Sequence, residues 1–231
     1  MISTAKINAT VRQIGQFDAM VANFKENYHY LPGDAPAFGG DGDGVIDTTA
    51  NCGWDDFGDA NVCEIANFWH AMAPDIYAAT ACGAFGAPVF TSGPSRNVPA
   101  SRLGRANSFF ISLPLTLDQF HADKSRHQNY YVILSPLQVA NDTWHHFITS
   151  ISANAALTAR DMLSLDSKID DGYANSGSFV SGAIGNRGDG YGGIISSPLS
   201  TCSSGPNYDL THDSEECTPL IRIGGTTGDP Q

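Results

Sequence analysis

Residues 1–34 read MISTAKINATVRQIGQFDAMVANFKENYHYLPGD and carry the clearest structural signal in the chain. Apolar side chains recur at spacings of three and four residues, which is the pattern of one buried face of an α-helix. They are Ile7, Val11, Ile14, Phe17, Val21, Phe24 and Tyr28. Polar side chains fill the other side, among them Lys6, Asn8, Arg12, Gln13, Gln16, Asn23 and Lys25. The segment therefore predicts an amphipathic helix over residues 1–31.

The end of this helix is marked more sharply than its start. Pro32 cannot donate a helical hydrogen bond, and Gly33 permits a tight turn. The predicted helix has about 28 residues and is about 42 Å long, which is long for a domain of this size. Its start has no strong capping signal beyond Ser3 or Thr4. We therefore expect the natural helix to continue upstream, with Met1 as an added start residue.

Composition and charge narrow the class of protein. The chain has 231 residues and is 42% hydrophobic, which is enough for one core, so we expect a single domain over residues 1–231. Its 24 glycines and 12 prolines predict extensive loops. The net charge of -12 argues against nucleic acid as a partner and favours cations, Ca²⁺ in particular. No run of eighteen apolar residues is present, so no segment of this sequence is expected to span a membrane.

Beyond the first helix, the sequence predicts a mixture of helices, strands and loops. The expected elements are a loop over 33–61, a helix starting near Asn61 and ending at Pro74, strands at Ser108–Leu117 and Asn129–Leu134, a helix at Thr158–Lys168, a Gly/Ser-rich loop from Gly172, and a late strand at Leu220–Ile223. Asp142–Ile151 fits either a helix or a strand. Thr158 can cap its helix, and Asp161 favours the positive N-terminal end. The fold class is therefore α+β with large irregular loops.

The segment Asp41-Gly42-Asp43-Gly44-Val45-Ile46-Asp47 resembles the middle of a Ca²⁺-binding loop. Alternate carboxylates surround one point, a glycine allows the tight turn, and an apolar residue anchors the loop. The candidate ligands are Asp41, Asp43 and Asp47. An EF-hand would need a carboxylate in place of Gly39 and a glutamate in place of Ala50, so this is not an EF-hand. The downstream residues Asp55, Asp56 and Asp59 could complete a different cage, and the alternative is a solvated Asp-Gly turn.

Five cysteines are present, at positions 52, 63, 82, 202 and 217. None belongs to a C-x-x-C pair, which argues against a zinc site and in favour of disulfides in an oxidising compartment. We expect Cys202 to pair with Cys217 across a polar loop, and Cys52 with Cys63 around the acidic loop. Cys82 is then left over. The alternative is five reduced thiols in a cytosolic protein.

No catalytic site emerges from the sequence. It contains no G-x-S-x-G, no P-loop and no H-E-x-x-H, and the seven histidines are scattered. Residues 188–193 fit G-x-G-x-x-G, but no strand pattern precedes them and no helix pattern follows, so a loop is the better interpretation. Asp170 and Asp171 follow a helix end and precede a glycine, which favours a turn or a cation contact over acid–base chemistry. We therefore expect no enzymatic activity.

Several motifs, taken in their order along the chain, resemble prepilin-type proteins: type IV pilins, minor pilins and the pseudopilins of type II secretion systems. The helix exit from Phe24 to Asp34 is similar to the family's F-x-x-x-Y-x-x-L-P-G-D. The run from Asp166 to Gly172 is similar to its D-x-K-x-D-D-G. Gly42-Asp43-Gly44, Glu64 and Phe68-Trp69-His70 lie between them, and the C-terminal cysteine pair is placed like the family's disulfide. The family's leader and apolar N-terminal helix are missing from this sequence.

The resemblance implies a long N-terminal helix packed on an antiparallel sheet, in a subunit that assembles and does not catalyse. Its partners would be other pilin-like subunits and the inner membrane, the latter through the missing helix. The head would lie in the periplasm or in an assembled extracellular filament. The side chains expected to hold the helix on the sheet are Ile7, Val11, Ile14, Phe17, Val21 and Phe24. A secreted Ca²⁺-dependent binding module or adhesin is the alternative.

Overall fold

The computed structural model describes residues 2–46, 64–77, 98–103, 109–115, 128–139, 151–186, 192–195 and 202–225. Its helices are α1 (Thr4–Tyr28), the short 3₁₀ helix η1 (Pro36–Phe38), α2 (Glu64–Met72) and α3 (Ala159–Ile169). Among the described residues, no helix combines the length and the apolarity that crossing a bilayer requires. The predicted α+β class is confirmed.

Helix α1 confirms the first prediction, with shorter ends. His29 adopts a left-handed conformation with φ 63°, and its backbone N–H donates to the carbonyl of Lys25 over 2.8 Å. This capping geometry ends the helix before Leu31. At Gly33 the chain then passes very close to α2. A Cβ at this position would lie only 2.4 Å from the carbonyl oxygen of Glu64, so a larger residue would clash. The turn therefore depends on a glycine.

The buried face of α1 is wider than its apolar pattern. Five of the six predicted side chains are buried and Val11 is half-buried, so their role in the core is confirmed. Gln13, which we placed on the polar side, is buried as well. Its amide donates to the carbonyl of Ala100 over 2.8 Å and accepts from the backbone N–H of Arg102 over 2.9 Å. A buried amide is tolerated here because both of its ends are hydrogen-bonded.

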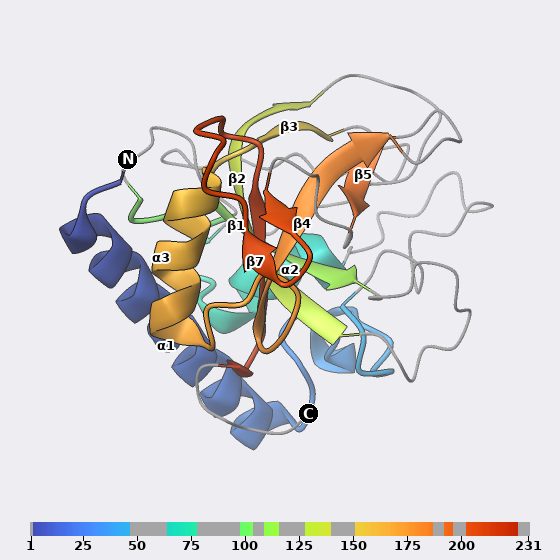
Figure 1. Cartoon of the computed structure of the whole chain (residues 1–231). Helices are drawn as coiled ribbons and strands as arrows, with labels where there is room; N and C mark the ends of the chain where they lie inside the picture. The colour runs from blue at the N-terminus through green and yellow to red at the C-terminus, as the bar shows by residue number, and fades with distance from the viewer. Residues whose placement is uncertain are drawn as a thin grey trace.

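The strands are β1 (Phe109–Leu115), β2 (Gln128–Val139), β3 (Ile151–Ala155), β4 (Phe179–Asn186), β5 (Gly192–Ile195), β6 (Ser203–Ser204), β7 (Asn207–Tyr208) and β8 (Thr218–Arg222). The main sheet has the order β1-β2-β8-β4-β5, with β3 also paired to β2, and all of its pairs are antiparallel. Strands β6 and β7 form a separate small hairpin. Figure 1 shows α1 and α3 side by side along one edge of the molecule, with the sheet behind them.

The predicted strand Asn129–Leu134 was too short. Strand β2 continues past Leu134 to Val139, and its register with β3 shifts between Ser135 and Gln138. Pro136 lies within this irregularity, which is a position where a strand tolerates proline. Asp142–Ile151 falls outside the described residues except for Ile151, which begins β3.

The prediction of a loop from Gly172 onward was wrong. Strand β4 lies in this region and pairs with β8 on one side and with β5 on the other. Its glycines and serine hid the strand pattern, because strand propensity depends on neighbouring strands. The G-x-G-x-x-G segment also ends in a strand, since Gly192 begins β5, and β4 precedes it.

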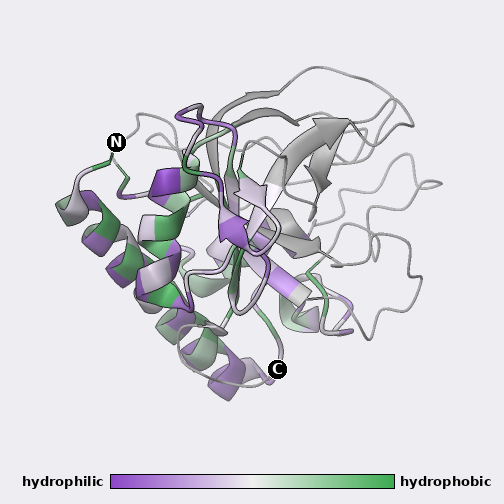
Figure 2. Ribbon diagram, viewed as in Figure 1, coloured by the Kyte–Doolittle hydropathy of each residue, from purple (hydrophilic) through white to green (hydrophobic). Residues whose placement is uncertain are grey.

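One core cluster joins the helices to the sheet. The ring of Phe17 on α1 lies 4.7 Å from Trp69 on α2 and 6.0 Å from Tyr131 on β2, measured between ring centroids. Buried Asp18 on α1 also accepts a hydrogen bond from the backbone N–H of Gly224 over 2.9 Å, just after β8. Figure 2 shows the matching pattern on α1, where hydrophobic and hydrophilic residues alternate around the helix. The helix is therefore held on the sheet by apolar contacts and by a buried carboxylate.

Candidate cation sites

Two groups of aspartates in the described part of the chain could hold a metal ion. The first group is Asp34, Asp41 and Asp43, and the second is Asp166, Asp170 and Asp171. Within each group, one carboxylate oxygen per residue lies within 4.8 Å of the others. Two oxygens on opposite sides of a bound Ca²⁺ are separated by about 4.6 to 5.2 Å. Both groups therefore have dimensions that suit a hard divalent cation.

The first group lies in the loop that follows α1. Buried Asp34 accepts hydrogen bonds from the backbone N–H groups of Gly42, over 2.8 Å, and of Gly44, over 3.1 Å. Both glycines have positive φ, 79° and 87°. This conformation favours glycine and turns the two N–H groups toward one carboxylate. Asp34 thereby folds the loop back on itself and brings Asp41 and Asp43 close to it.

The loop is also anchored to two elements of the core. The backbone N–H of Asp41 donates to Glu64 Oε1 on α2 over 3.0 Å. Buried Asn129 on β2 accepts from the backbone N–H of Ile46 over 2.9 Å and donates to the carbonyl of Gly44 over 3.0 Å. The carboxylates of Asp41 and Asp43 remain exposed, and each accepts a backbone N–H two residues ahead. Their positions are thus fixed by the fold.

The electrostatics of this loop favour a bound cation. Burial raises the pKa of Asp34, and the carboxylates of Asp43 and Asp41 raise it further, while the hydrogen bonds from Gly44 and Gly42 oppose both effects. A cation placed between the three carboxylates would stabilise their ionised forms. The described part of the loop contains no Lys or Arg. The negative charge of the three carboxylates is therefore not neutralised within it.

The predicted ligand set is only partly tested by this geometry. The structure brings Asp41 and Asp43 together, as the alternating pattern indicated. Asp47 lies outside the described residues, and so do Asp55, Asp56 and Asp59. Asp34 was missed because sequence reasoning assigned the Leu-Pro-Gly-Asp segment to ending the helix. Its distance of seven residues from Asp41 gives no sequence signal for a shared site.

The second group joins the end of α3 to the hairpin β6–β7. Asp166 is completely buried and accepts from the Tyr208 hydroxyl over 2.7 Å and from the backbone N–H of Gly172 over 3.1 Å. Exposed Asp170 accepts from the backbone N–H groups of Ser178 and Phe179. These bonds close the turn between α3 and β4.

Asp171 completes the second group from the solvent side. It accepts from the backbone N–H of Tyr173 and from the Ser176 hydroxyl, each over 2.8 Å. The expected turn at Asp170 and Asp171 is therefore present, and the alternative of a cation contact remains compatible with it. The sequence analysis did not assign Asp166 to a site. Asp166 lies on the last turn of α3 and Asp170 is its C-terminal cap, so the short spacing of four residues was the available signal.

Burial is the main reason that the pKa of Asp166 rises from 3.8 to about 6, with Asp171 and Asp170 adding to the effect. The hydrogen bonds from Tyr208 and Gly172 oppose this rise. Burial and the adjacent Asp166 carboxylate also raise the pKa of Tyr208. At neutral pH, Asp166 is therefore mostly ionised in an environment that disfavours its charge.

We expect the stability contribution of Asp166 to decrease as the pH rises. Because the folded-state pKa of about 6 exceeds the ordinary 3.8, this contribution is fully present below pH 3.8 and is lost as the pH rises through 6. Urea unfolding of wild type and of Asp166→Asn at several pH values measures it. The wild type should lose stability relative to the variant between pH 4 and 7, and saturating Ca²⁺ should reduce that loss. A constant difference across this range would contradict the prediction.

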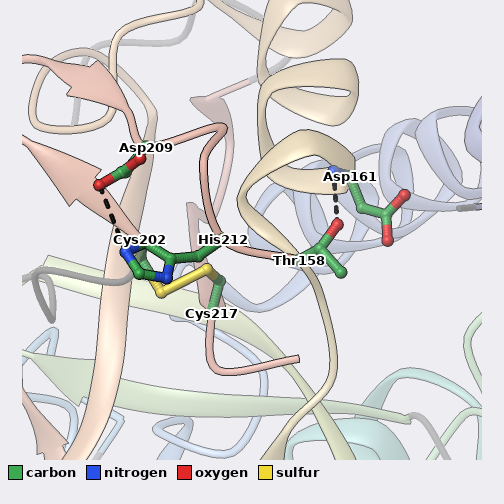
Figure 3. Close-up of a disulfide and its surroundings, with 6 residues drawn as sticks. All are labelled: Thr158, Asp161, Cys202, Asp209, His212 and Cys217. Atoms are coloured by element: carbon green, nitrogen blue, oxygen red, sulfur yellow. Dashed lines mark hydrogen bonds and ion pairs between the residues drawn. A yellow bond between two sulfur atoms is a disulfide. The ribbon is translucent and has the colours of Figure 1, made fainter. Parts of the chain in front are cut away.

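The disulfide between Cys202 and Cys217 is confirmed, with a Cα–Cα distance of 5.5 Å. Backbone hydrogen bonds in both directions link Cys217 to Leu157, just before α3. Figure 3 shows the bridge near the N-terminal end of α3, where Thr158 accepts a hydrogen bond from the backbone N–H of Asp161. Thr158 is thus the predicted cap. Cys52, Cys63 and Cys82 lie outside the described residues.

Comparison with protein-family models, with curated proteins and with solved structures finds no match.

Proposed function

We propose that this chain is the head of a structural subunit, a pilin, minor pilin or pseudopilin, in a type IV pilus-like or type II secretion filament. It acts by assembly and not by catalysis. Its partners are other pilin-like subunits and, through an apolar helix upstream of Ile2, the inner membrane. The head lies in the periplasm or in the assembled filament, and nucleic acid is not a partner.

The observation that carries this proposal is the long helix α1 held on an antiparallel sheet. It has 25 residues, and its buried side chains extend from Ile7 to Phe24. Most of the stability of a helix in a protein comes from packing of its amphipathic face, so the core stabilises α1. A rigid helix that runs along the edge of the molecule can transmit the position of a membrane segment to the head. This arrangement suits a subunit whose assembly is directed by its N-terminal helix.

The filament proposal is tested on the complete gene of the source organism. The sequence upstream of the codon for Ile2 should encode a basic leader, a cleavage glycine and an apolar helix with glutamate at its fifth position. The complete product with an epitope tag should then appear in sheared filaments, and replacing the cleavage glycine should abolish this. Absence of an apolar helix upstream, or a product found entirely as a free monomer, would overturn the proposal.

We also propose that the loop containing Asp34, Asp41 and Asp43 binds Ca²⁺. Calorimetry should detect binding with a dissociation constant of about 0.1 to 1 mM, the range of extracellular Ca²⁺ modules. Asp43→Asn should weaken it at least about tenfold, since this change removes one charged ligand. Asp213→Asn, at an exposed acidic residue outside both groups, should leave it unchanged. The absence of heat at millimolar Ca²⁺ would contradict the proposal, and an effect of Asp171→Asn would indicate the second group instead.

A secreted Ca²⁺-dependent binding module is the second candidate function. The two aspartate groups favour it, together with exposed Tyr30, whose ring lies next to Gly42 in the first loop. Aromatic rings at a protein surface can stack against ligands. Binding to a glycan array that disappears on removal of Ca²⁺ would favour this candidate over the filament subunit.

A further inference from the structure

Three Asp-Gly pairs lie in the described part of the chain, and each forms a turn that requires its glycine. They are Asp41-Gly42, Asp43-Gly44 and Asp171-Gly172. The glycines have φ of 79°, 87° and 81°, a region that other residues rarely adopt. A glycine that follows an aspartate is also chemically reactive, because no side chain hinders the attack of its backbone nitrogen on the aspartate side chain. The turns therefore depend on a dipeptide that isomerises readily.

The isomerisation needs no oxidant, metal or cofactor. The backbone nitrogen of the glycine bonds to Cγ of the aspartic acid, the Cγ–OH bond breaks, and the hydroxyl leaves as water together with the proton of the N–H. Water then opens the resulting cyclic imide at either of its carbonyls. One product is aspartate, and the other is isoaspartate, in which the main chain runs through Cβ and Cγ. The first step therefore requires a glycine nitrogen that can lose its proton and approach Cγ.

In this fold, a buried carboxylate holds the N–H of each of the three glycines. Asp34 accepts from Gly42 over 2.8 Å and from Gly44 over 3.1 Å. Asp166 accepts from Gly172 over 3.1 Å. Both acceptors are buried, so water has little access to replace them. A negative charge beside the N–H disfavours loss of its proton, and the charge-assisted hydrogen bond fixes the position of the nitrogen.

The reacting carboxyl groups are restrained as well. Each one accepts, through its Oδ1, the backbone N–H two residues ahead: Asp41 from Asp43 over 3.1 Å, Asp43 from Val45 over 2.9 Å, and Asp171 from Tyr173 over 2.8 Å. Each carboxyl group is thus bonded to the nitrogen that follows the glycine residue and not to the nitrogen that would attack it. The same two restraints occur at all three pairs, in two loops that are far apart in the sequence.

We propose that Asp41, Asp43 and Asp171 are sites of isoaspartate formation that two buried carboxylates protect. Asp34 protects the two pairs of the first loop, and Asp166 protects the pair that follows α3. Isomerisation would insert an additional carbon into the main chain of a turn and displace the residues after it. Asp34 and Asp166 therefore have a role that requires neither a bound cation nor assembly with other subunits.

Isoaspartate mapping of two charge-neutralising variants tests this protection. The purified chain is kept at neutral pH in EDTA, so that no cation occupies the loops, and its peptides are assayed for isoaspartate over time. Asp34→Asn should raise the combined rate at Asp41 and Asp43 at least about fivefold, because a neutral acceptor with one oxygen replaces a charged one with two. It should leave the rate at Asp171 unchanged. Asp166→Asn should have the opposite pattern, so each variant is the matched control of the other.

Two results would overturn the proposal. One is a variant that accelerates all three sites equally, since this would mean general loosening of the fold. The other is a folded wild type that forms isoaspartate as fast as the same chain unfolded in urea. If a variant does not fold, amide hydrogen exchange of the wild type decides. The N–H groups of Gly42, Gly44 and Gly172 should exchange at least about tenfold more slowly than in urea, and exchange at the unfolded rate would refute the protection.

Discussion

Replacing Trp69 by alanine should lower the free energy of unfolding by about 3 to 5 kcal/mol. Trp69 is completely buried and joins α1, α2 and β2. Its ring centroid lies 4.7 Å from that of Phe17, 4.9 Å from Phe68 and 5.9 Å from Tyr131. The cavity left by alanine would remove the contacts of Trp69 with Phe17 on α1 and with Tyr131 on β2. Urea unfolding followed by circular dichroism measures the loss.

Two further variants make this prediction specific. The indole Nε1–H of Trp69 has no hydrogen-bond partner in the part of the chain that the structure describes. Trp69→Phe therefore removes volume but no hydrogen bond, and it should cost less than half as much as Trp69→Ala. Tyr173→Ala, at a ring that is 51% exposed, should cost less than about 0.5 kcal/mol. Equal losses for Trp69→Ala and Tyr173→Ala would show that the aromatic cluster does not support the fold.

The elements that could be predicted from the sequence are those with strong local signals. Helix α1 follows from the spacing of Ile7 to Phe24, and α3 follows from its cap at Thr158. Strand β4 was missed because Gly182 and Ser181 carry little strand propensity. Gly182 sits where a Cβ would lie 3.0 Å from the side chain of Leu220 on β8, so the sheet itself selects a small residue. The need for a small residue at this position arises from the pairing of β4 with β8, so it cannot be read from the sequence of β4 alone.

In the candidate sites too, only the residues with a local sequence pattern could be predicted. Asp41 and Asp43 are neighbours in the sequence, and their alternation predicted a shared site. Asp34 joins them because Gly42 and Gly44 turn their N–H groups toward its carboxylate. Asp166 lies only four residues before Asp170, but the hydrogen bond that it accepts from the hydroxyl of Tyr208 comes from 42 residues away in the chain. Long-range hydrogen bonds of this kind have no periodic signature in sequence.

Removing the disulfide should destabilise the fold by about 3 kcal/mol, because the bridge closes a loop of 15 residues and restricts the unfolded chain. Both cysteines are completely buried, and Cys217 is hydrogen-bonded to Leu157, just before α3. Loss of the bridge should therefore loosen the β6–β7 hairpin, which holds Asp166 through Tyr208. Hydrogen exchange should detect this as faster exchange at Asp209, whose backbone N–H donates to the carbonyl of Cys202.

A double-mutant cycle separates the bridge from packing at the two positions. Cys202→Ala and Cys217→Ala should each lose most of the 3 kcal/mol, since either change abolishes the bridge. The double variant should then lose little more than the worse single variant, which is the non-additivity expected of one shared bond. Losses that add up would mean that each cysteine acts through its own packing. In that case the C-terminal loop would be held by the hydrogen bonds to Leu157 and by the Asp166–Tyr208 contact, and not by the covalent link.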